Sequence, residues 1–478
     1  MSTPFRALTR LFPALLAAAC LALAAAPAPP AVAVEAGVNL TNPNPQQVAV
    51  VKSLGVHWVR VFATWPDLEP QPGVFASNWL YYYEKLFRSL PSGTKVIVDV
   101  VDTPSWETGS SNEHQPPANP QDYAAFLASL AGRWGSRVSA FEIWNEENTA
   151  AWWPTGPQPA AYAALLKATY PAVKAADPSA TVLLGGLAGN DYQFLEGVYQ
   201  AGAKGYFDAV AVHTDTACDV LSPYDFLRES DDRMIADSFL AYREVHAVML
   251  ANGDDKPIWM TELSWRTTEA TCPEGAFAGQ KPEGVTDAQQ ALYLSQAYHC
   301  LAQNPYVPVA LWFPLEDEGA VLSGLLRADG SHKPSYAAMR EYARHGDQLK
   351  EPCGVFTGPA IHVSSPADHL SYSGPLPIVV SARSHAGVFR IRLEIDGKLI
   401  RNYDGPTFPA TLHGALDWQG AKHISYGRHI LTFLAYDKER NVSRLSIVIV
   451  HRAPKRPHRH HQPTVQAPPG TPPHGSRR

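Results

Sequence analysis

The chain has 478 residues, of which 45% are hydrophobic, 18% charged and 10% aromatic. This composition is typical of globular proteins and excludes wholesale disorder, a collagen and a coiled coil. The chain holds 39 Lys and Arg against 45 Asp and Glu, a formal net charge of −6. That balance argues against a nucleic-acid-binding protein with a basic face, and the length allows two or three domains.

The first 33 residues have the features of a secretory signal peptide. Arg6 and Arg10 precede an apolar run over about 11–26, and an A-x-A pattern stands at 31–33. A positive start, an apolar core and this cleavage pattern predict removal during export. A membrane anchor is the alternative, but the run is marginal in length, rich in alanine and followed by prolines. We therefore expect a secreted protein, either extracellular or in the cell envelope.

From residue 35 to about 350, apolar runs typical of strands alternate with segments of helical periodicity. The strand-like runs are Glu35–Asn39, His57–Phe62, Lys95–Val101, Val138–Ile143, Thr181–Gly185, Asp208–His213, Ile258–Glu262 and Val307–Phe313. One helix-like segment shows an apolar stripe at Tyr123, Phe126, Leu127 and Leu130 after the capping pair Asn119-Pro120. The others cover about 44–54, 78–90, 158–176, 191–204, 230–252, 286–303 and 333–345. Eight such repeats predict a (β/α)8 TIM barrel over residues 34–354. An open doubly wound sheet would favour a glycine-rich loop after the first strand, which is absent from the sequence.

The remainder of the chain has a different pattern. Residues 355–452 alternate with period two, and Asp396-Gly397 between two such runs indicates a hairpin. We predict a small immunoglobulin-like β-sandwich, a packing appendage rather than a carbohydrate-binding module. Residues 453–478 are rich in Pro, His and Arg, which predicts a disordered tail whose basic charge meets an anionic cell surface.

Export predicts that the cysteines form disulfides, because exported proteins fold in an oxidising compartment. Four cysteines remain beyond the signal peptide, and they allow three pairings. We predict Cys218–Cys272, since both follow barrel strands on the same face. We also predict Cys300–Cys353, since both lie near the last helices on the outside of the barrel.

Two carboxylates are predicted to face each other at the mouth of the barrel. Reactive groups of such barrels lie at the carboxyl ends of the strands. There the fourth predicted strand leads into Trp144-Asn145-Glu146-Glu147, and the seventh ends at Glu262. Glycoside hydrolysis requires one carboxylic acid and one carboxylate on opposite sides of the bond. Because neighbours in a strand alternate in direction, only one of Glu146 and Glu147 should face the cavity.

Tryptophans are the second indication of a sugar site. Half of the 12 tryptophans fall at strand ends or in the loops that follow: Trp65, Trp106, Trp152, Trp153, Trp265 and Trp312. Indole rings can stack on the apolar face of a sugar, and a wide aromatic rim favours an endo-acting enzyme. The alternative is that these rings pack the loops.

These motifs together resemble the clan A glycoside hydrolases, most closely family 39 and its relatives near family 5. The similar segments are Trp144-Asn145-Glu146, Thr261-Glu262, Trp65–Phe75 and Gly324–Tyr336, with Arg60 and Trp312 on strands 2 and 8. The resemblance implies that Glu146 is the general acid/base, with a raised pKa, and that Glu262 is the nucleophile, kept ionised by Arg60. It implies that Asn145 binds the sugar 2-hydroxyl and that Trp312 forms the floor of the central sugar-binding subsite. It also implies that His213 orients the two carboxylates. Trp65, Trp106, Trp153 and Trp265 are further substrate-binding candidates.

The sequence therefore predicts a monomeric retaining β-glycosidase that acts on a polysaccharide or oligosaccharide without a metal or other cofactor. A non-catalytic carbohydrate-binding protein on a glycosidase scaffold is the alternative from another class. An inverting or transglycosylating enzyme on the same scaffold is the third. Glu147 also stays open as the acid.

Overall fold

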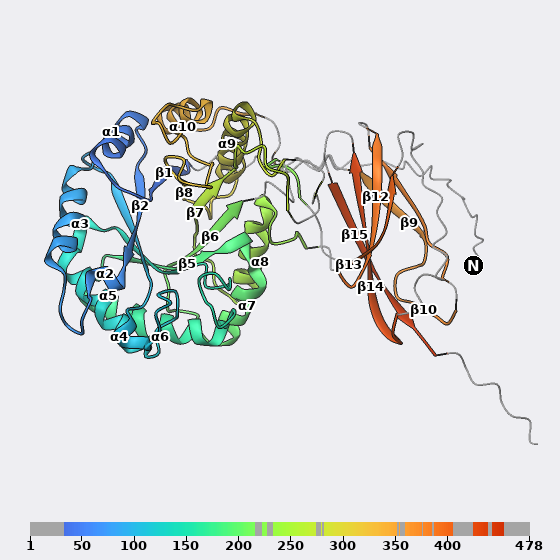
Figure 1. Cartoon of the computed structure of the whole chain (residues 1–478), viewed down its shortest axis with the longest axis horizontal. Coiled ribbons are helices and arrows are strands. Elements are labelled where there is room, and N and C mark those ends of the chain that lie inside the picture. The colour runs from blue at the N-terminus through green and yellow to red at the C-terminus, as the bar shows by residue number, and fades with distance from the viewer. Residues whose placement is uncertain are drawn as a thin grey trace, which may run out of the picture.

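The computed structural model describes residues 33–215, 222–226, 233–273, 279, 282–350, 353, 359–374, 376–384, 387–404, 424–437 and 442–453. Eight parallel strands close into a barrel in chain order, with β8 paired to β1 (Figure 1). They are β1 (Glu35–Leu40), β2 (Trp58–Thr64), β3 (Lys95–Val101), β4 (Ala140–Asn145), β5 (Thr181–Leu187), β6 (Ala209–Asp215), β7 (Ile258–Ser264) and β8 (Val309–Trp312). The closed barrel confirms the predicted (β/α)8 fold and excludes the open sheet.

Helices surround the barrel (Figure 1). They are α1 (Pro45–Leu54), α2 (Trp65–Leu68), α3 (Ser77–Ser89), α4 (Ser105–Thr108), α5 (Pro120–Trp134), α6 (Pro159–Ala176), α7 (Tyr192–Gln200), α8 (Tyr242–Ala251), α9 (Asp287–Ala302) and α10 (Pro334–His345). Three short 3-10 turns, η1 (Gly135–Arg137), η2 (Ala188–Asn190) and η3 (Phe239–Ala241), join them to their neighbours. Within the described residues, no helix is both long and apolar enough to cross a bilayer.

Local sequence signals explain where several helices start. The side chains of Asn44, Asn119 and Thr286 accept hydrogen bonds from the first backbone N–H groups of α1, α5 and α9. The predicted helix over 230–252 is too long, because α8 begins only at Tyr242. Before it, Ser238 N–H donates to the Ile235 carbonyl in a turn, as expected of a serine preceded by an aspartate.

The amino-terminal end of the barrel is filled by apolar side chains. Trp58 and Trp259 meet edge to face at 4.8 Å between ring centroids, within a separate buried cluster that includes Ile97, Leu183 and Leu311. Such packing leaves no passage for solvent through the barrel axis. Polar groups inside the barrel are therefore concentrated toward the carboxyl ends of the strands.

The C-terminal region is an all-β domain, as predicted. Its strands are β9 (Ala360–Ser365), β10 (Leu370–Tyr372), β11 (Val379–Arg383), β12 (Val388–Ile395), β13 (Lys398–Asp404), β14 (Gly427–Asp437) and β15 (Val442–His451). A five-stranded sheet in the order β10-β15-β14-β12-β13 and the pair β11-β9 share one apolar core. Asp396 and Gly397 both have positive φ and form the tight turn between β12 and β13, which confirms the predicted hairpin.

One of the two predicted disulfides is confirmed. Cys300 in α9 is bonded to Cys353, with 5.1 Å between the Cα atoms. Cys272 is also disulfide-bonded, but its predicted partner Cys218 lies outside the described residues. The predicted signal peptide up to residue 32 and the tail beyond 453 lie outside them too.

Removing the Cys300–Cys353 bridge is expected to destabilise the protein without changing its chemistry. The bridge closes a loop of 53 residues around α10, so it restricts the unfolded chain. The double variant Cys300→Ala/Cys353→Ala should lose about 2–4 kcal/mol of unfolding free energy. Denaturant titration followed by tryptophan fluorescence measures this loss. An unchanged unfolding midpoint would contradict the expected contribution.

Candidate active site

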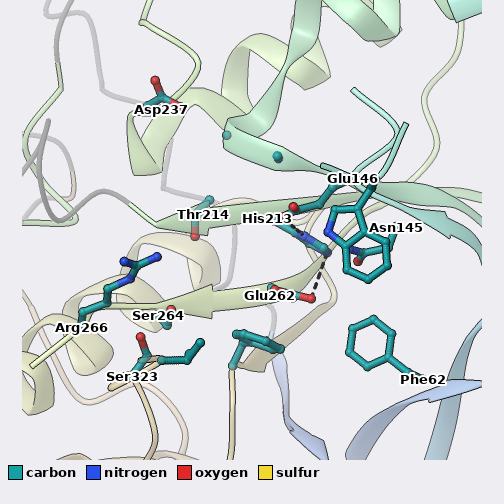
Figure 2. A pocket seen from close by; sticks show the side chains of 15 residues that line it. Phe62, Asn145, Glu146, His213, Thr214, Asp237, Glu262, Ser264, Arg266 and Ser323 are labelled. Atoms are coloured by element: carbon teal, nitrogen blue, oxygen red, sulfur yellow. Dashed lines mark hydrogen bonds and ion pairs between the residues drawn. The ribbon is translucent and has the colours of Figure 1, made fainter. Parts of the chain in front are cut away.

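A cavity of about 310 Å³ opens at the carboxyl ends of the barrel strands (Figure 2). Its wall includes Asn145 at the end of β4, Glu146 directly after that strand, and His213 and Thr214 from β6. Glu262 and Ser264 from β7 complete the polar part of this wall, with Arg266, Asp237 and Ser323 from the loops. Phe62, Trp152, Phe313 and Val321 give it apolar surface. The cavity thus lies where the fold predicts an active site.

Glu146 and Glu262 approach each other around His213 (Figure 2). His213 Nδ1 lies 3.0 Å from Glu146 Oε1, and its Nε2 lies 3.7 Å from Glu262 Oε1. One oxygen of each glutamate and one nitrogen of His213 all fall within 4.8 Å of one another. These three side chains are close enough to ligate a metal ion, and they are also arranged as two carboxylates joined through a histidine.

Arg60 organises the floor of the site from β2. The side chain is fully buried, and all five of its N–H groups donate hydrogen bonds. The acceptors are Glu142 at 2.7 Å, Asn39 at 3.0 Å, Glu262 at 2.6 Å, Asp99 at 2.7 Å and Asn145 at 2.9 Å. The guanidinium therefore fixes Glu262 and Asn145 relative to each other.

The charges of this cluster shift its ionisation. Burial lowers the pKa of His213, but Glu262, Glu142 and Glu146 outweigh burial and raise that pKa to about 10. His213 is therefore a cation at neutral pH. Burial raises the pKa of Glu262 above its usual value, and His213 and Arg60 oppose that rise. The raised pKa of Glu262 disagrees with the prediction of a fully ionised nucleophile. Burial destabilises the charged carboxylate more than the His213 and Arg60 cations stabilise it.

Glu147 lies on the other side of the strand end from Glu146. It is fully buried, does not line the cavity, and neither carboxyl oxygen has a hydrogen-bond partner among the described residues. Burial raises the pKa of Glu147 to about 8, so it is a neutral acid at pH 7. Of the two neighbouring glutamates, Glu146 is therefore the one placed to meet a substrate, as strand alternation predicts.

The variant Glu147→Gln is expected to keep activity and to gain stability at alkaline pH. Because the folded pKa is raised from 4.5 to about 8, the stabilisation from the neutral form is complete below pH 4.5. This stabilisation of the wild type is lost as pH rises through 8, because Glu147 then ionises in the folded protein. The glutamine of the variant cannot ionise. The difference in melting temperature between variant and wild type should therefore grow from pH 5 to pH 8 and then level off. If Glu147→Gln instead lost as much activity as Glu146→Gln, Glu147 would be the acid.

Two glycines of β5 leave space for these side chains. A Cβ atom at Gly186 would overlap the imidazole of His213, and one at Gly185 would meet the carboxylate of Glu147. The strand that faces the acid/base candidate thus carries no side chain at these two positions. The sequence shows this glycine pair plainly, but only the packing explains it.

The tryptophan predictions need correction. Trp65, Trp153, Trp265 and Trp312 are at most 2% exposed and belong to the core, and none of them lines the catalytic cavity. Trp312 therefore does not floor the cavity, and the next residue, Phe313, lines it instead. These indole rings pack on other aromatic rings instead, as Trp65 does on Phe126 at 5.2 Å between ring centroids.

Trp106 is also a packing residue, and Trp152 is the tryptophan of the predicted rim that reaches the catalytic cavity. Trp106 meets Trp65 edge to face and donates from Nε1 to the Glu69 carbonyl at 3.0 Å. Trp152 lies parallel to Phe62 at 6.4 Å between ring centroids, and both line the cavity. The aromatic surface of the site is therefore smaller than predicted.

Sequence reasoning missed the carboxylates beneath the site. Asp99 in β3 and Glu142 in β4 are register partners, fully buried, and each binds Arg60. An acidic residue in the middle of an otherwise apolar strand is the signal that could have revealed them. Buried acids require a cation, and Arg60 is the cation on the neighbouring strand.

Comparisons with known proteins agree with this geometry. Residues 33–215 match the model of the cellulase family (glycosyl hydrolase family 5), a segment that includes Arg60, Glu146 and His213 and ends before Glu262. A family 39 glycoside hydrolase from Bacteroides cellulosilyticus WH2 has a similar fold, with a TM-score of 0.54 and 19% identity over 88% of this chain and 81% of that one. No curated protein matches the chain.

A monomeric β-xylosidase from Caulobacter crescentus CB15 is similar as well, with a TM-score of 0.50 and 17% identity over 76% of this chain and 82% of that one. At such identities the likeness concerns the fold. The chain is therefore similar to glycosyl hydrolase family 5 over residues 33–215, and similar in fold to a family 39 glycoside hydrolase.

Proposed function

We propose that the protein is a secreted retaining β-glycosidase that hydrolyses O-glycosidic bonds of a polysaccharide or oligosaccharide. The observation that carries this proposal is the short gap between Glu146 and Glu262, whose nearer oxygens lie within 4.8 Å. Retaining enzymes hold their two carboxyl groups about 5 Å apart, whereas inverting enzymes leave about 6.5–9.5 Å for a water molecule. Secretion is proposed from the signal-peptide pattern of the first 33 residues.

The reaction would proceed in two displacements. In the first, Glu262 attacks the anomeric carbon, and Glu146 donates its proton to the leaving glycosidic oxygen. This step forms an ester between Glu262 and the sugar. In the second, Glu146 accepts a proton from water, the water oxygen attacks the anomeric carbon, and Glu262 leaves as a carboxylate. The product keeps the configuration of the substrate.

Neighbouring groups have supporting roles. Asn145 accepts from Arg60 through Oδ1, so its amide Nδ2 is the atom available to donate to the sugar 2-hydroxyl. The His213 cation holds Glu146 and favours the ionised form of Glu262, which the first displacement requires. Arg60 supports the same ionised form through its 2.6 Å contact with Glu262.

A panel of aryl β-glycosides and plant or bacterial polysaccharides tests the proposal. Proton NMR of the first product formed should show the β-anomer before mutarotation. A first α-anomer would establish an inverting enzyme instead. Binding of polysaccharides without any release would favour the non-catalytic carbohydrate-binding protein, and Asn145 and Trp152 would then remain as its contact residues.

A further inference from the structure

Trp152 lines the catalytic cavity, and two hydrogen bonds fix its backbone. Its carbonyl accepts from Trp144 Nε1–H at 2.8 Å, and its N–H donates to Thr149 Oγ1 at 3.4 Å. These bonds fix the point from which the side chain starts, but they leave its side-chain torsion angles free. The orientation of the indole ring therefore depends on what the ring itself contacts.

Two aromatic side chains lie against the Trp152 ring. Phe62 from β2 is parallel to it, with 6.4 Å between ring centroids and 6° between the planes, and also lines the cavity. His114, from the loop between α4 and α5, is closer, at 4.3 Å between centroids and with 47° between the planes. His114 is not among the residues that line the cavity. It therefore supports the indole ring from outside the space that a substrate would enter.

His114 is itself held by Asp102, the first residue after β3. His114 Nδ1–H donates to Asp102 Oδ1 at 2.7 Å, because a carboxylate can only accept. The Asp102 side chain is only 8% exposed, whereas that of His114 is 41% exposed. A histidine ring as exposed as this one could otherwise rotate, so the hydrogen bond fixes the imidazole against the indole.

The backbone brings Asp102 and His114 together. Thr103 N–H donates to the Glu113 carbonyl at 2.7 Å, which closes the chain between the two neighbouring residues. Asp102 has a φ of 68°, in the left-handed region that residues other than glycine seldom occupy. Such a conformation costs free energy and persists where surrounding contacts hold it, often at a functional site. The strained residue here is the one whose carboxylate holds His114.

The supported ring is connected to the floor of the site. The guanidinium carbon of Arg60 lies 4.6 Å from the centroid of the Phe62 ring, and Arg60 also forms an ion pair with Glu262. A row of neighbouring side chains therefore runs from the loop to the candidate nucleophile: His114, Trp152, Phe62 and Arg60. A change in the orientation of Trp152 would alter the wall of the cavity along this row.

We propose that His114, fixed by Asp102, positions the Trp152 ring in the wall of the catalytic cavity. The proposal rests on the proposed glycosidase function and adds two positioning residues to that site. Both residues act through Trp152 rather than on the reacting atoms. A ring that is ordered before binding costs a substrate less conformational entropy, so the pair should affect substrate binding more than the chemical step.

Removal of the imidazole tests the proposal by kinetics. His114→Ala should raise KM for the best substrate of the glycoside panel about three- to tenfold and leave kcat within about twofold, since one side chain must then be ordered on binding. His114→Phe should restore the KM of the wild type, because it keeps a ring against Trp152.

His246→Ala is the matched control. His246 also pairs with an aspartate and stacks on an aromatic ring, that of Tyr306, but neither His246 nor Tyr306 lines the cavity. Its KM should equal that of the wild type. A KM for His114→Ala no higher than that for His246→Ala would overturn the proposal.

Two changes at Asp102 separate its carboxylate from its backbone conformation. Glycine and asparagine both tolerate a positive φ, so neither variant adds backbone strain. Asp102→Asn keeps an oxygen that accepts from His114 and should retain the KM of the wild type. Asp102→Gly removes that acceptor and should raise KM toward the value of His114→Ala. Equal KM values for the two Asp102 variants would contradict the role of the hydrogen bond.

Fluorine NMR tests the positioning role without turnover. In protein labelled with 5-fluorotryptophan, the Trp152 resonance is the one that Trp152→Phe removes. It should be a single line in the wild type and in His114→Phe. In His114→Ala it should be broadened or split, because the ring then samples several orientations.

The spectra also keep the two proposals apart. A Trp152 line in His114→Ala as narrow as in the wild type would overturn the positioning role, whatever the kinetics show. Failure of the wild type to cleave any glycoside of the panel would count against the glycosidase function, and the fluorine spectra would still decide whether His114 positions Trp152.

Discussion

Glu262→Gln is expected to lower kcat for an aryl β-glycoside by about 10,000-fold or more, which is the range for loss of an essential nucleophile. The amide oxygen can still accept from Arg60, so the site keeps its shape while it loses the attacking carboxylate. Initial rates of aglycone release measure the change. Azide added to Glu262→Ala should restore release and give the α-glycosyl azide, because azide attacks from the side that the carboxylate occupied.

Glu283→Gln is the matched control. Glu283 forms an ion pair with Arg266, which lines the same cavity, but Glu283 itself does not line it. The same change from carboxylate to amide should lower kcat less than tenfold there. If Glu262→Gln also stayed within tenfold of wild type, another group would be the nucleophile.

Arg60→Met is expected to lower the unfolding free energy by about 3–5 kcal/mol, the cost of removing one partner from a buried charge cluster. Asp99, Glu142 and Glu262 would keep their carboxylates in the barrel without the cation that each contacts within 2.7 Å. Denaturant unfolding at pH 7 measures the loss. Activity should fall as well, because Glu262 and Asn145 lose the group that holds them.

Two further variants separate charge from geometry. Arg60→Lys keeps the charge but offers three donors instead of five, so its stability should lie between Arg60→Met and wild type. Arg133→Met removes an arginine that is half exposed and paired with Glu84 on the surface. It should change stability by about 0.5 kcal/mol or less. Equal midpoints for wild type and Arg60→Met would contradict a stabilising role of the cluster.

The barrel could be predicted because hydrophobic periodicity is a local property of the chain. The strand Lys95–Val101 has the predicted bounds, and the other strands start or end within about two residues of theirs. Glu146, Glu262, Arg60 and His213 could be placed together for a related reason. In a closed parallel barrel, the strand number and the strand end fix the position of a residue on the rim.

Properties that depend on non-local packing could not be predicted. Whether Trp312 or Phe313 faces the cavity depends on the contacts that Trp312 makes with the Trp265 ring and the Ser323 carbonyl, and the strand pattern does not encode these contacts. The pKa of Glu262 depends on the balance between its burial and two cations from other strands. Both the choice of residue that faces the cavity and the pKa of Glu262 are set by the three-dimensional packing.

The glycine pair of β5 has a consequence for how this site can change. Gly185 and Gly186 contribute volume rather than functional groups, because His213 and Glu147 occupy the space where their side chains would stand. Any larger residue at position 186 would displace the histidine that joins the two candidate catalytic glutamates. New specificity is therefore more accessible by altering the loop around Trp152, whereas positions 185 and 186 of β5 have no room for a side chain.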